Sequence, residues 1–182
     1  MDKNTCIELY AHNREAYDKL CILLRKHKKA CIIHPTGTGK SFIAFKYIED
    51  NPDKKVLWLS PSQHIFASQI SNLIRSAGAQ TTVKIRERII FSTYTGISNG
   101  SVKRFRNIGV IILDEFHRCG ARIWNESLKK VLKYRKRAVL IGLSATHIRY
   151  LDSQRDMAEE IFGGNVASYL TLSKAFDRGI LR

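Results

Sequence analysis

The stretch that decides the fold of this chain is a glycine-rich turn, His34-Pro35-Thr36-Gly37-Thr38-Gly39-Lys40-Ser41. It follows a short apolar run, 30–33, and precedes an amphipathic run, 42–48, which predicts the order strand, turn, helix. Glycines let several backbone N–H groups point at one anion, and the helix N-terminus adds its partial positive charge. Gly37 and Gly39 must supply this flexibility, because His34 stands where such a turn usually has its first glycine. The stretch is therefore predicted to bind phosphate.

Two side chains at the end of this turn have predicted roles. Lys40 would reach the β- and γ-phosphates of a nucleotide, and the Ser41 hydroxyl would ligate Mg²⁺. The alternative is an ordinary strand-to-helix turn that happens to contain Gly, Lys and Ser. We consider it weaker, because the flanking runs and the turn itself agree on a phosphate-binding loop.

Length and composition indicate one globular domain, residues 1–182, of which 44% are hydrophobic. No apolar run approaches the roughly 20 residues of a membrane span, and the N-terminus lacks the layout of a signal peptide. The four cysteines form no Cys-x-x-Cys pair, which is typical of reduced thiols. We therefore expect a cytoplasmic protein with no membrane partner. The cysteines are Cys6, Cys21, Cys31 and Cys119.

The charge of the chain is strongly positive, with a formal net charge of +15 and a pI near 9.9. Lysines and arginines occur in runs at 25–29, 84–88, 103–106 and 129–137. Each run alone is compatible with a solvated helix face or loop. Four runs of one sign in a small domain favour a nucleic-acid partner, because a bound nucleotide alone does not need so many cations.

Apolar runs alternate with amphipathic runs along the chain. Expected strands are 30–33, 56–59, 81–85, 88–92, 110–113 and 138–143, with a further short strand near the C-terminus. Expected helices are 7–24, 41–49, 60–78, a short basic helix after 101, 123–133, 153–161 and a last helix. This alternation predicts an α/β fold, in which a mostly parallel sheet has helices on both faces. Ligands in such folds bind beyond the carboxyl ends of the strands.

A pair of carboxylates, Asp114 and Glu115, follows the most strand-like run. In a nucleotide hydrolase, Asp114 would hold Mg²⁺, and Glu115 would orient and deprotonate the attacking water. Adjacent acids at a strand end are common on protein surfaces, but here they occur together with a phosphate-binding loop. His117 is placed to hydrogen-bond to the turn Ser144-Ala145-Thr146, which would couple the nucleotide site to a second strand end.

With these motifs in order, the chain resembles the first RecA-like domain of a superfamily 2 helicase or translocase of the DExH type. The similarity is greatest to the branch that contains type III restriction-enzyme helicase subunits. Residues 35–41 resemble motif I, 114–117 motif II and 144–146 motif III. The resemblance implies a P-loop NTPase fold, ATP and Mg²⁺ as cofactors, and ATP contacts from 36–41. The corresponding residues are Thr36, Gly37, Thr38, Gly39, Lys40 and Ser41.

Further motifs extend the resemblance to nearly the whole chain. Segment 60–69 resembles motif Ia and 92–94 a Thr-Tyr element, which implies nucleic-acid contacts from Ser62, Gln69, Thr93 and Tyr94. Segment 9–16 resembles the element that grips adenine, with Asn13 in the position of its usual glutamine. In two further departures, Gln69 comes one position later than usual and His147 replaces a proline.

The resemblance implies a motor that couples ATP hydrolysis to the movement or separation of nucleic-acid strands, with DNA preferred over RNA. Helicases of this type use a second RecA-like domain, which we expect in the full-length protein. The present chain alone should bind nucleotide weakly and hydrolyse it poorly. One alternative is a nucleic-acid-binding module with a regulatory or vestigial nucleotide pocket. A small-molecule kinase is less favoured, because no arginine-rich lid follows the core.

Overall fold

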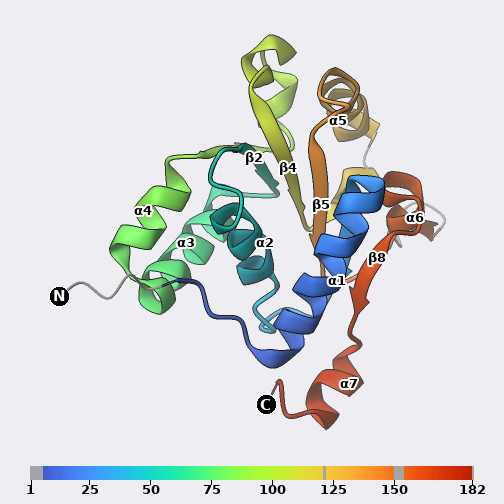
Figure 1. The fold of residues 1–182 in the computed structure, drawn as a ribbon. Helices are drawn as coiled ribbons and strands as arrows, with labels where there is room; N and C mark the ends of the chain where they lie inside the picture. Colours follow the sequence, from blue (N-terminus) through green and yellow to red (C-terminus); the bar gives the residue numbers. More distant parts are fainter. Residues whose placement is uncertain (1–5, 121, 150–153, 182) are drawn as a thin grey trace.

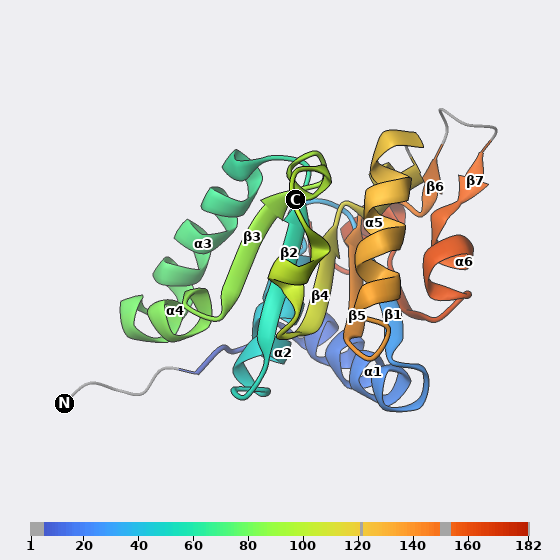
Figure 2. The ribbon, with the colours of Figure 1, turned by 90° about the horizontal axis from the view of Figure 1, so that it is seen from above.

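Figures 1 and 2 show the computed structural model, which describes residues 6–120, 122–149 and 154–181. Six parallel strands form one sheet in the spatial order β3-β2-β4-β5-β1-β8. This confirms the α/β fold with a parallel sheet. The strands are β1 (Lys29–Ile33), β2 (Lys55–Ser60), β3 (Ile89–Thr93), β4 (Ile108–Asp114), β5 (Val139–Ser144) and β8 (Val166–Tyr169). A short antiparallel pair, β6 (Ile148–Arg149) and β7 (Arg155–Asp156), stands apart.

Helices cover both faces of the sheet. The first face carries α1 (Ala11–His27), α2 (Lys40–Glu49), α3 (Gln63–Ala77) and α4 (Ala79–Arg86). The second face carries η1 (Gly96–Ser98), η2 (Val102–Phe105), η3 (Phe116–Gly120), α5 (Arg122–Tyr134) and α6 (Met157–Phe162). A last helix, α7 (Leu172–Asp177), lies near the beginning of α1 in Figure 1. Alternate residues of the buried strands therefore enter two separate cores.

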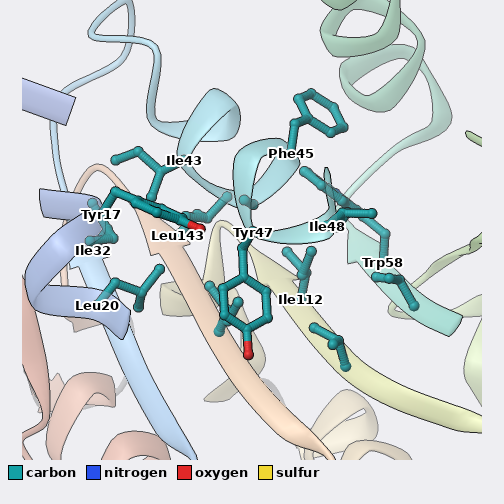
Figure 3. Close-up of a cluster of buried hydrophobic side chains, with 14 of the residues drawn as sticks. Tyr17, Leu20, Ile32, Ile43, Phe45, Tyr47, Ile48, Trp58, Ile112 and Leu143 are labelled. Atoms are coloured by element: carbon teal, nitrogen blue, oxygen red, sulfur yellow. The ribbon is translucent and has the colours of Figure 1, made fainter. Parts of the chain in front are cut away.

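The first core lies between the helices of the first face and the sheet, and Figure 3 shows the part of it around α2. Trp58 of β2 is fully buried, and its ring centroid lies 4.9 Å from that of Phe45 and 5.5 Å from that of Phe66. Phe66 in turn stacks on Phe91 of β3 at 4.4 Å. These contacts fix the position of α3 on the sheet.

The second core contains a close approach to Gly142 in β5. A Cβ atom on Gly142 would lie 2.3 Å from Cζ of Phe162 and 2.9 Å from Cδ1 of Phe116, distances that carbon atoms do not reach. Both rings are fully buried and pack edge to face, with centroids 5.1 Å apart. Only glycine therefore lets Phe116, which lies between the acid pair and His117, pack into this core.

Replacing Gly142 by Ala should destabilise the fold by about 2–3 kcal/mol, because one added methyl group overpacks a rigid aromatic contact. The free energy of unfolding in urea measures this effect. Gly109→Ala is the matched control: it lies in the neighbouring strand, where a Cβ atom would meet only the flexible side chain of Lys54, at 3.4 Å. Equal losses in the two variants would contradict the role given to the aromatic pair.

Three expected elements differ in the structure. Residues 81–85, which are expected to form a strand, are helical within α4, where Thr82 and Ile85 are buried on one helix face. The first helix begins at Ala11 and not at Ile7, whose N–H donates to the Glu49 carboxylate at 3.1 Å. The helix expected over 153–161 begins at Met157, and residues 150–153 lie outside the described part of the chain.

Among the residues that the structure describes, no helix is both long and apolar enough to cross a bilayer.

Candidate nucleotide-binding site

The glycine-rich turn connects the carboxyl end of β1 to the first residue of α2. Gly37 has a φ of 90° and Gly39, the N-cap of α2, a φ of 79°, both in the left-handed region that favours glycine. A Cβ atom on Gly39 would also lie 3.0 Å from Nδ2 of Asn13. The two glycines thus allow the tight turn that the sequence predicts, and the backbone N–H groups at the start of α2 have no carbonyl partner within the helix.

Two side chains from the first turn of α1 hold the loop in place. Nδ2 of Asn13 donates to the carbonyl oxygen of Thr38 at 2.8 Å, and Nε2 of His12 lies 2.9 Å from the same oxygen. The hydroxyl of Thr38 donates back to the carbonyl of Pro35 at 2.8 Å. Asn13, which the sequence places in the adenine-gripping segment, therefore braces the phosphate-binding loop with its amide nitrogen. Its Oδ1 atom is buried and has no partner in the described structure.

The conformation of His34 shows why this position of the loop does not need the usual glycine. Its φ is not positive, so no glycine is required there. The ring is 1% exposed, and Nε2 lies 2.7 Å from the hydroxyl of Ser168 in β8. Burial, and then the nearby His12 and Lys40, lower its pKa to about 4. His34 is therefore neutral near pH 7 and ties the loop to the edge strand of the sheet.

This buried histidine predicts acid sensitivity of the fold. Because its pKa is about 4 in the folded chain and about 6.5 when unfolded, the unfolded state binds the extra proton between these values. The stability from neutral His34 is present above pH 6.5 and is lost as the pH falls towards 4. Between pH 7 and pH 5 the loss should be about 2 kcal/mol.

Urea unfolding at the two pH values checks this expectation. His34→Gln should lose less stability on acidification than the wild type, whereas His64→Gln, at an exposed histidine of α3, should lose as much as the wild type. An unchanged acid sensitivity in His34→Gln would show that this ring is not the titrating group.

An ion pair joins the glycine-rich loop to the acid pair at the end of β4. Nζ of Lys40 lies 3.3 Å from Oε1 of Glu115, and the side chains are 11% and 20% exposed. Glu115 follows β4 directly and has a φ of 53°, an unfavourable conformation for a residue with a side chain. Such strain occurs preferentially at functional sites, where the surrounding fold enforces it. The strain here turns the Glu115 carboxylate towards the phosphate-binding loop.

Asp114 is 1% exposed and is held by the last residue of β2 and by a residue of α3. Its Oδ2 accepts hydrogen bonds from Oγ of Ser60 at 3.1 Å and from Nε2 of Gln69 at 2.9 Å. Burial raises the pKa of this carboxyl, against the opposing hydrogen bond from Gln69. A buried carboxylate that lacks a full complement of partners is well suited to a cation, which would remove the cost of its charge.

The predicted link between the acid pair and the turn after β5 is present. Nδ1 of His117 lies 2.7 Å from Oγ of Ser144 and 3.4 Å from Oε2 of Glu115. Oγ of Ser144 also lies 3.4 Å from Oε2 of Glu115, and the N–H of Thr146 donates to it at 3.4 Å. The ends of β4 and β5 are thus joined through Ser144. A movement of the Glu115 side chain would change the hydrogen bonds of the turn 144–146.

A cavity of about 830 Å³ opens beside these groups. It is lined by Thr36, Gly37, Gly39, Lys40, Ser41, Asn13, Gln69 and Glu115, with further residues of 8–10 and of α3. The Ser41 hydroxyl lines this cavity, and the carboxyl group of Asp114 is hydrogen-bonded to Gln69, another lining residue; both are hard oxygen ligands of the kind that hold Mg²⁺ together with substrate phosphates. Within the described residues, no cluster of three or more His, Cys, Asp or Glu forms a protein-only metal site. The donor set therefore fits Mg²⁺ bound jointly with a nucleotide.

The four residues expected to contact nucleic acid have different surroundings. The Ser62 hydroxyl caps α3, and that of Thr93 accepts from the N–H of Gly96; both lie at strand carboxyl ends and are half-buried. Gln69 turns inward to Asp114. Tyr94 is 1% exposed and donates its hydroxyl to the carbonyl of Asp114 at 2.8 Å. In this conformation the Tyr94 ring faces the core and supports the acid pair, so it offers no surface to a strand.

Comparisons with known proteins agree with this geometry. The family described as "Type III restriction enzyme, res subunit" matches residues 6–149. The helicase domain of Hef from Pyrococcus furiosus superimposes with a TM-score of 0.67 at 18% identity, covering 93% of this chain and 40% of that one. The UvsW helicase of bacteriophage T4 gives a TM-score of 0.62 at 14% identity, covering 93% of this chain and 64% of that one.

A third solved structure is the ATP-dependent type ISP restriction-modification enzyme LlaBIII bound to DNA. Its TM-score is 0.68 at 18% identity, over 96% of this chain but 16% of that one. The present chain thus spans less than two thirds of each of these proteins, and no curated sequence matches it. Because the family match covers most of the sequence, the chain belongs to the type III restriction enzyme res subunit family, and it shares its fold with the solved helicase and restriction-enzyme structures named above.

Proposed function

We propose that this chain is the ATP-binding motor domain of a DNA helicase or translocase, which couples Mg²⁺-dependent ATP hydrolysis to strand movement or separation. The observation that carries this proposal is the pairing of Lys40 with a strained Glu115, 3.3 Å apart, beside a buried Asp114. The phosphate-binding loop, a candidate metal ligand and a candidate base thus converge on one cavity. A structural ion pair alone would not require an unfavourable backbone conformation.

Each residue of the site would have its own role in ATP binding and hydrolysis. The N–H groups of the loop 36–41 would surround the phosphates, and Lys40 would exchange Glu115 for the β- and γ-phosphates. Ser41 and Asp114 would hold Mg²⁺, which offsets the negative charge that develops on the phosphate oxygens. Glu115, released from Lys40, would orient the attacking water and accept its proton. Gln69 and Ser60 would keep Asp114 in place through their hydrogen bonds.

Conformational changes caused by ATP binding and hydrolysis would be transmitted to the strand-binding surface through Ser144. His117 and Thr146 share its hydroxyl with Glu115, so a rearrangement of Glu115 would move the turn after β5. We assign strand contact to the carboxyl ends of β2 and β3, where Ser62 and Thr93 lie, with Gln69 and Tyr94 beneath them. These contacts would be to phosphates and largely independent of base sequence.

The substrate and partners are inferred from chemistry and from the relatives. Asn13 lines the cavity next to the phosphate-binding loop, where its side chain would lie beside a bound nucleotide. We prefer DNA to RNA because LlaBIII, one of the similar solved structures, has DNA bound. A second RecA-like domain in the full-length protein would close on the cavity and supply the arginine that phosphoryl transfer requires. We place the protein in the cytoplasm.

A nucleic-acid-binding module with a regulatory nucleotide pocket is the second candidate, and the net charge of +15 favours it. The two functions differ in whether nucleic acid accelerates hydrolysis. We expect the 182-residue chain to hydrolyse ATP slowly with or without single-stranded DNA. A longer protein that carries a second RecA-like domain should hydrolyse ATP faster when DNA is added, and less so with RNA. Binding of DNA without any such acceleration would favour the module, and rapid DNA-stimulated turnover by the short chain would contradict the need for a second domain.

A further inference from the structure

The positive charge of this chain is concentrated at the end of the sheet opposite the nucleotide site. Five short segments lead into β1, β2, β3, β4 and β5: residues 25–29, 53–55, 86–88, 104–107 and 133–138. Together they contain fourteen lysines and arginines but only two carboxylates, Asp53 and Glu87. The rest of the chain is close to neutral, so these segments account for most of the net charge of +15.

The topology of the sheet brings these segments into one row, which we call the basic rim. In the order β3-β2-β4-β5-β1, neighbours are confirmed by pairing: Val56 N–H donates to the carbonyl of Arg88, Lys55 pairs with Ile108, and Leu140 N–H donates to the carbonyl of Lys28. Five parallel strands about 4.8 Å apart make a row about 20 Å long. The seven residues of β4 separate the rim from Asp114 by about 20 Å.

Some of these cations stabilise the fold. Arg88 donates to the carbonyls of Ile48 and Asn51, and Arg135 donates twice to the carbonyl of Ile108. Arg25, Lys26 and Lys133 lie in the last turns of helices, where cations stabilise the helix dipole. Neither reason applies to those in the turns and at the first strand positions. These are Lys29, Lys54, Lys55, Arg106, Lys136 and Arg137, and none of them has a carboxylate partner in the described residues.

We propose that the basic rim is a second nucleic-acid-binding surface, which holds the phosphate backbone on the side of the domain away from ATP. A duplex length of about 20 Å carries about twelve phosphates on its two strands, and those that face the rim can pair with several of its free cations. An acidic protein would need carboxylates at the same spacing as the cations of the rim. A nucleic acid already carries evenly spaced phosphates along its backbone. The inference does not rest on the proposed function, because the rim requires neither ATP nor hydrolysis.

The test compares two variants that lose the same charge. In the rim variant, Lys55→Gln, Lys136→Gln and Arg137→Gln remove exposed cations at the starts of β2 and β5, the two strands that flank β4. In the control variant, Lys19→Gln, Arg75→Gln and Lys174→Gln remove three exposed cations from α1, α3 and α7. Fluorescence anisotropy of a short fluorescein-labelled DNA duplex, from 50 to 200 mM salt, gives the affinity and its salt dependence for each protein.

The rim variant should bind the duplex about tenfold or more weakly than the wild type, with a slope of log K against log salt smaller by about 2–3. The control variant should stay within about twofold, and circular dichroism should show both variants folded. Equal losses in both variants would show that only net charge matters and would overturn the proposal. So would a rim variant that binds duplex normally but loses binding to polyglutamate or to phosphatidylserine vesicles, since the rim would then serve a protein or a membrane.

Discussion

Replacement of Glu115 by Gln is expected to lower the rate of ATP hydrolysis by a factor of about 10²–10⁴ while ATP binding is retained. The amide keeps the size of the side chain but cannot accept a proton from water. It also ends the ion pair with Lys40, 3.3 Å away, which a nucleotide must displace in the wild type. Affinity for ATP should therefore stay the same or rise, so the loss should appear in kcat and not in KM.

Single-turnover hydrolysis, in a protein that carries the second RecA-like domain, measures this effect without interference from product release. Glu126→Gln, at an exposed glutamate of α5, removes the same charge away from the cavity and should hydrolyse ATP at the wild-type rate. Hydrolysis by Glu115→Gln at the wild-type rate would exclude Glu115 as the base.

Replacement of Lys40 by Ala is expected to weaken ATP binding by about a hundredfold or more. The ammonium group would make charge-assisted hydrogen bonds to two phosphates in a site that is largely shielded from water, and such bonds contribute about 1.5–3 kcal/mol each. Every 1.4 kcal/mol corresponds to a tenfold change in affinity. Lys40 is 9% exposed at the first turn of α2, so no other lysine can take its place at the loop without a change in the fold.

Equilibrium titration with a fluorescent ATP analogue and Mg²⁺ measures the affinity. Lys19→Ala, at an exposed lysine of α1, is the matched control and should bind like the wild type. Far-UV circular dichroism should show that Lys40→Ala is folded. A folded Lys40→Ala protein with unchanged affinity would remove the phosphate-binding role from this loop.

Much of the fold was predictable because its signals are local. The strands that enter both cores are short apolar runs, and their alternation with amphipathic helices implies a parallel sheet. The convergence of the functional residues followed from the same topology, since Lys40, Asp114, Ser144 and Thr93 each follow a strand. The contact of His117 with Ser144, 2.7 Å apart, confirms one predicted pairing that is distant in sequence.

Other contacts were not predictable because they depend on the relative placement of elements. The bond from Gln69 to Asp114 requires the exact rotation of α3 on the sheet, which the stacking of Phe66 on Phe91 sets. The burial of Tyr94 depends on how the segment after β3 folds back on the second core. Ser60, which also holds Asp114, lies in the helix expected over 60–78 and in the segment that resembles motif Ia, and neither expectation includes this contact. One signal could have predicted this contact. Ser60 is a polar residue at the end of the apolar run 56–59, and Asp114 follows the apolar run 110–113 in the same way.

The central claim is that Mg²⁺ and ATP bind between the loop 36–41 and the acid pair. Titration of the ¹⁵N-labelled chain with Mg²⁺ and ATP, followed by amide chemical shifts, tests it most directly. The account predicts that the largest shifts occur at Gly37, Gly39, Lys40 and Ser41, at 114–117 and at Asn13, and that Lys40→Ala abolishes them. Saturable shifts centred elsewhere, or none at millimolar ATP in the folded wild-type chain, would contradict it.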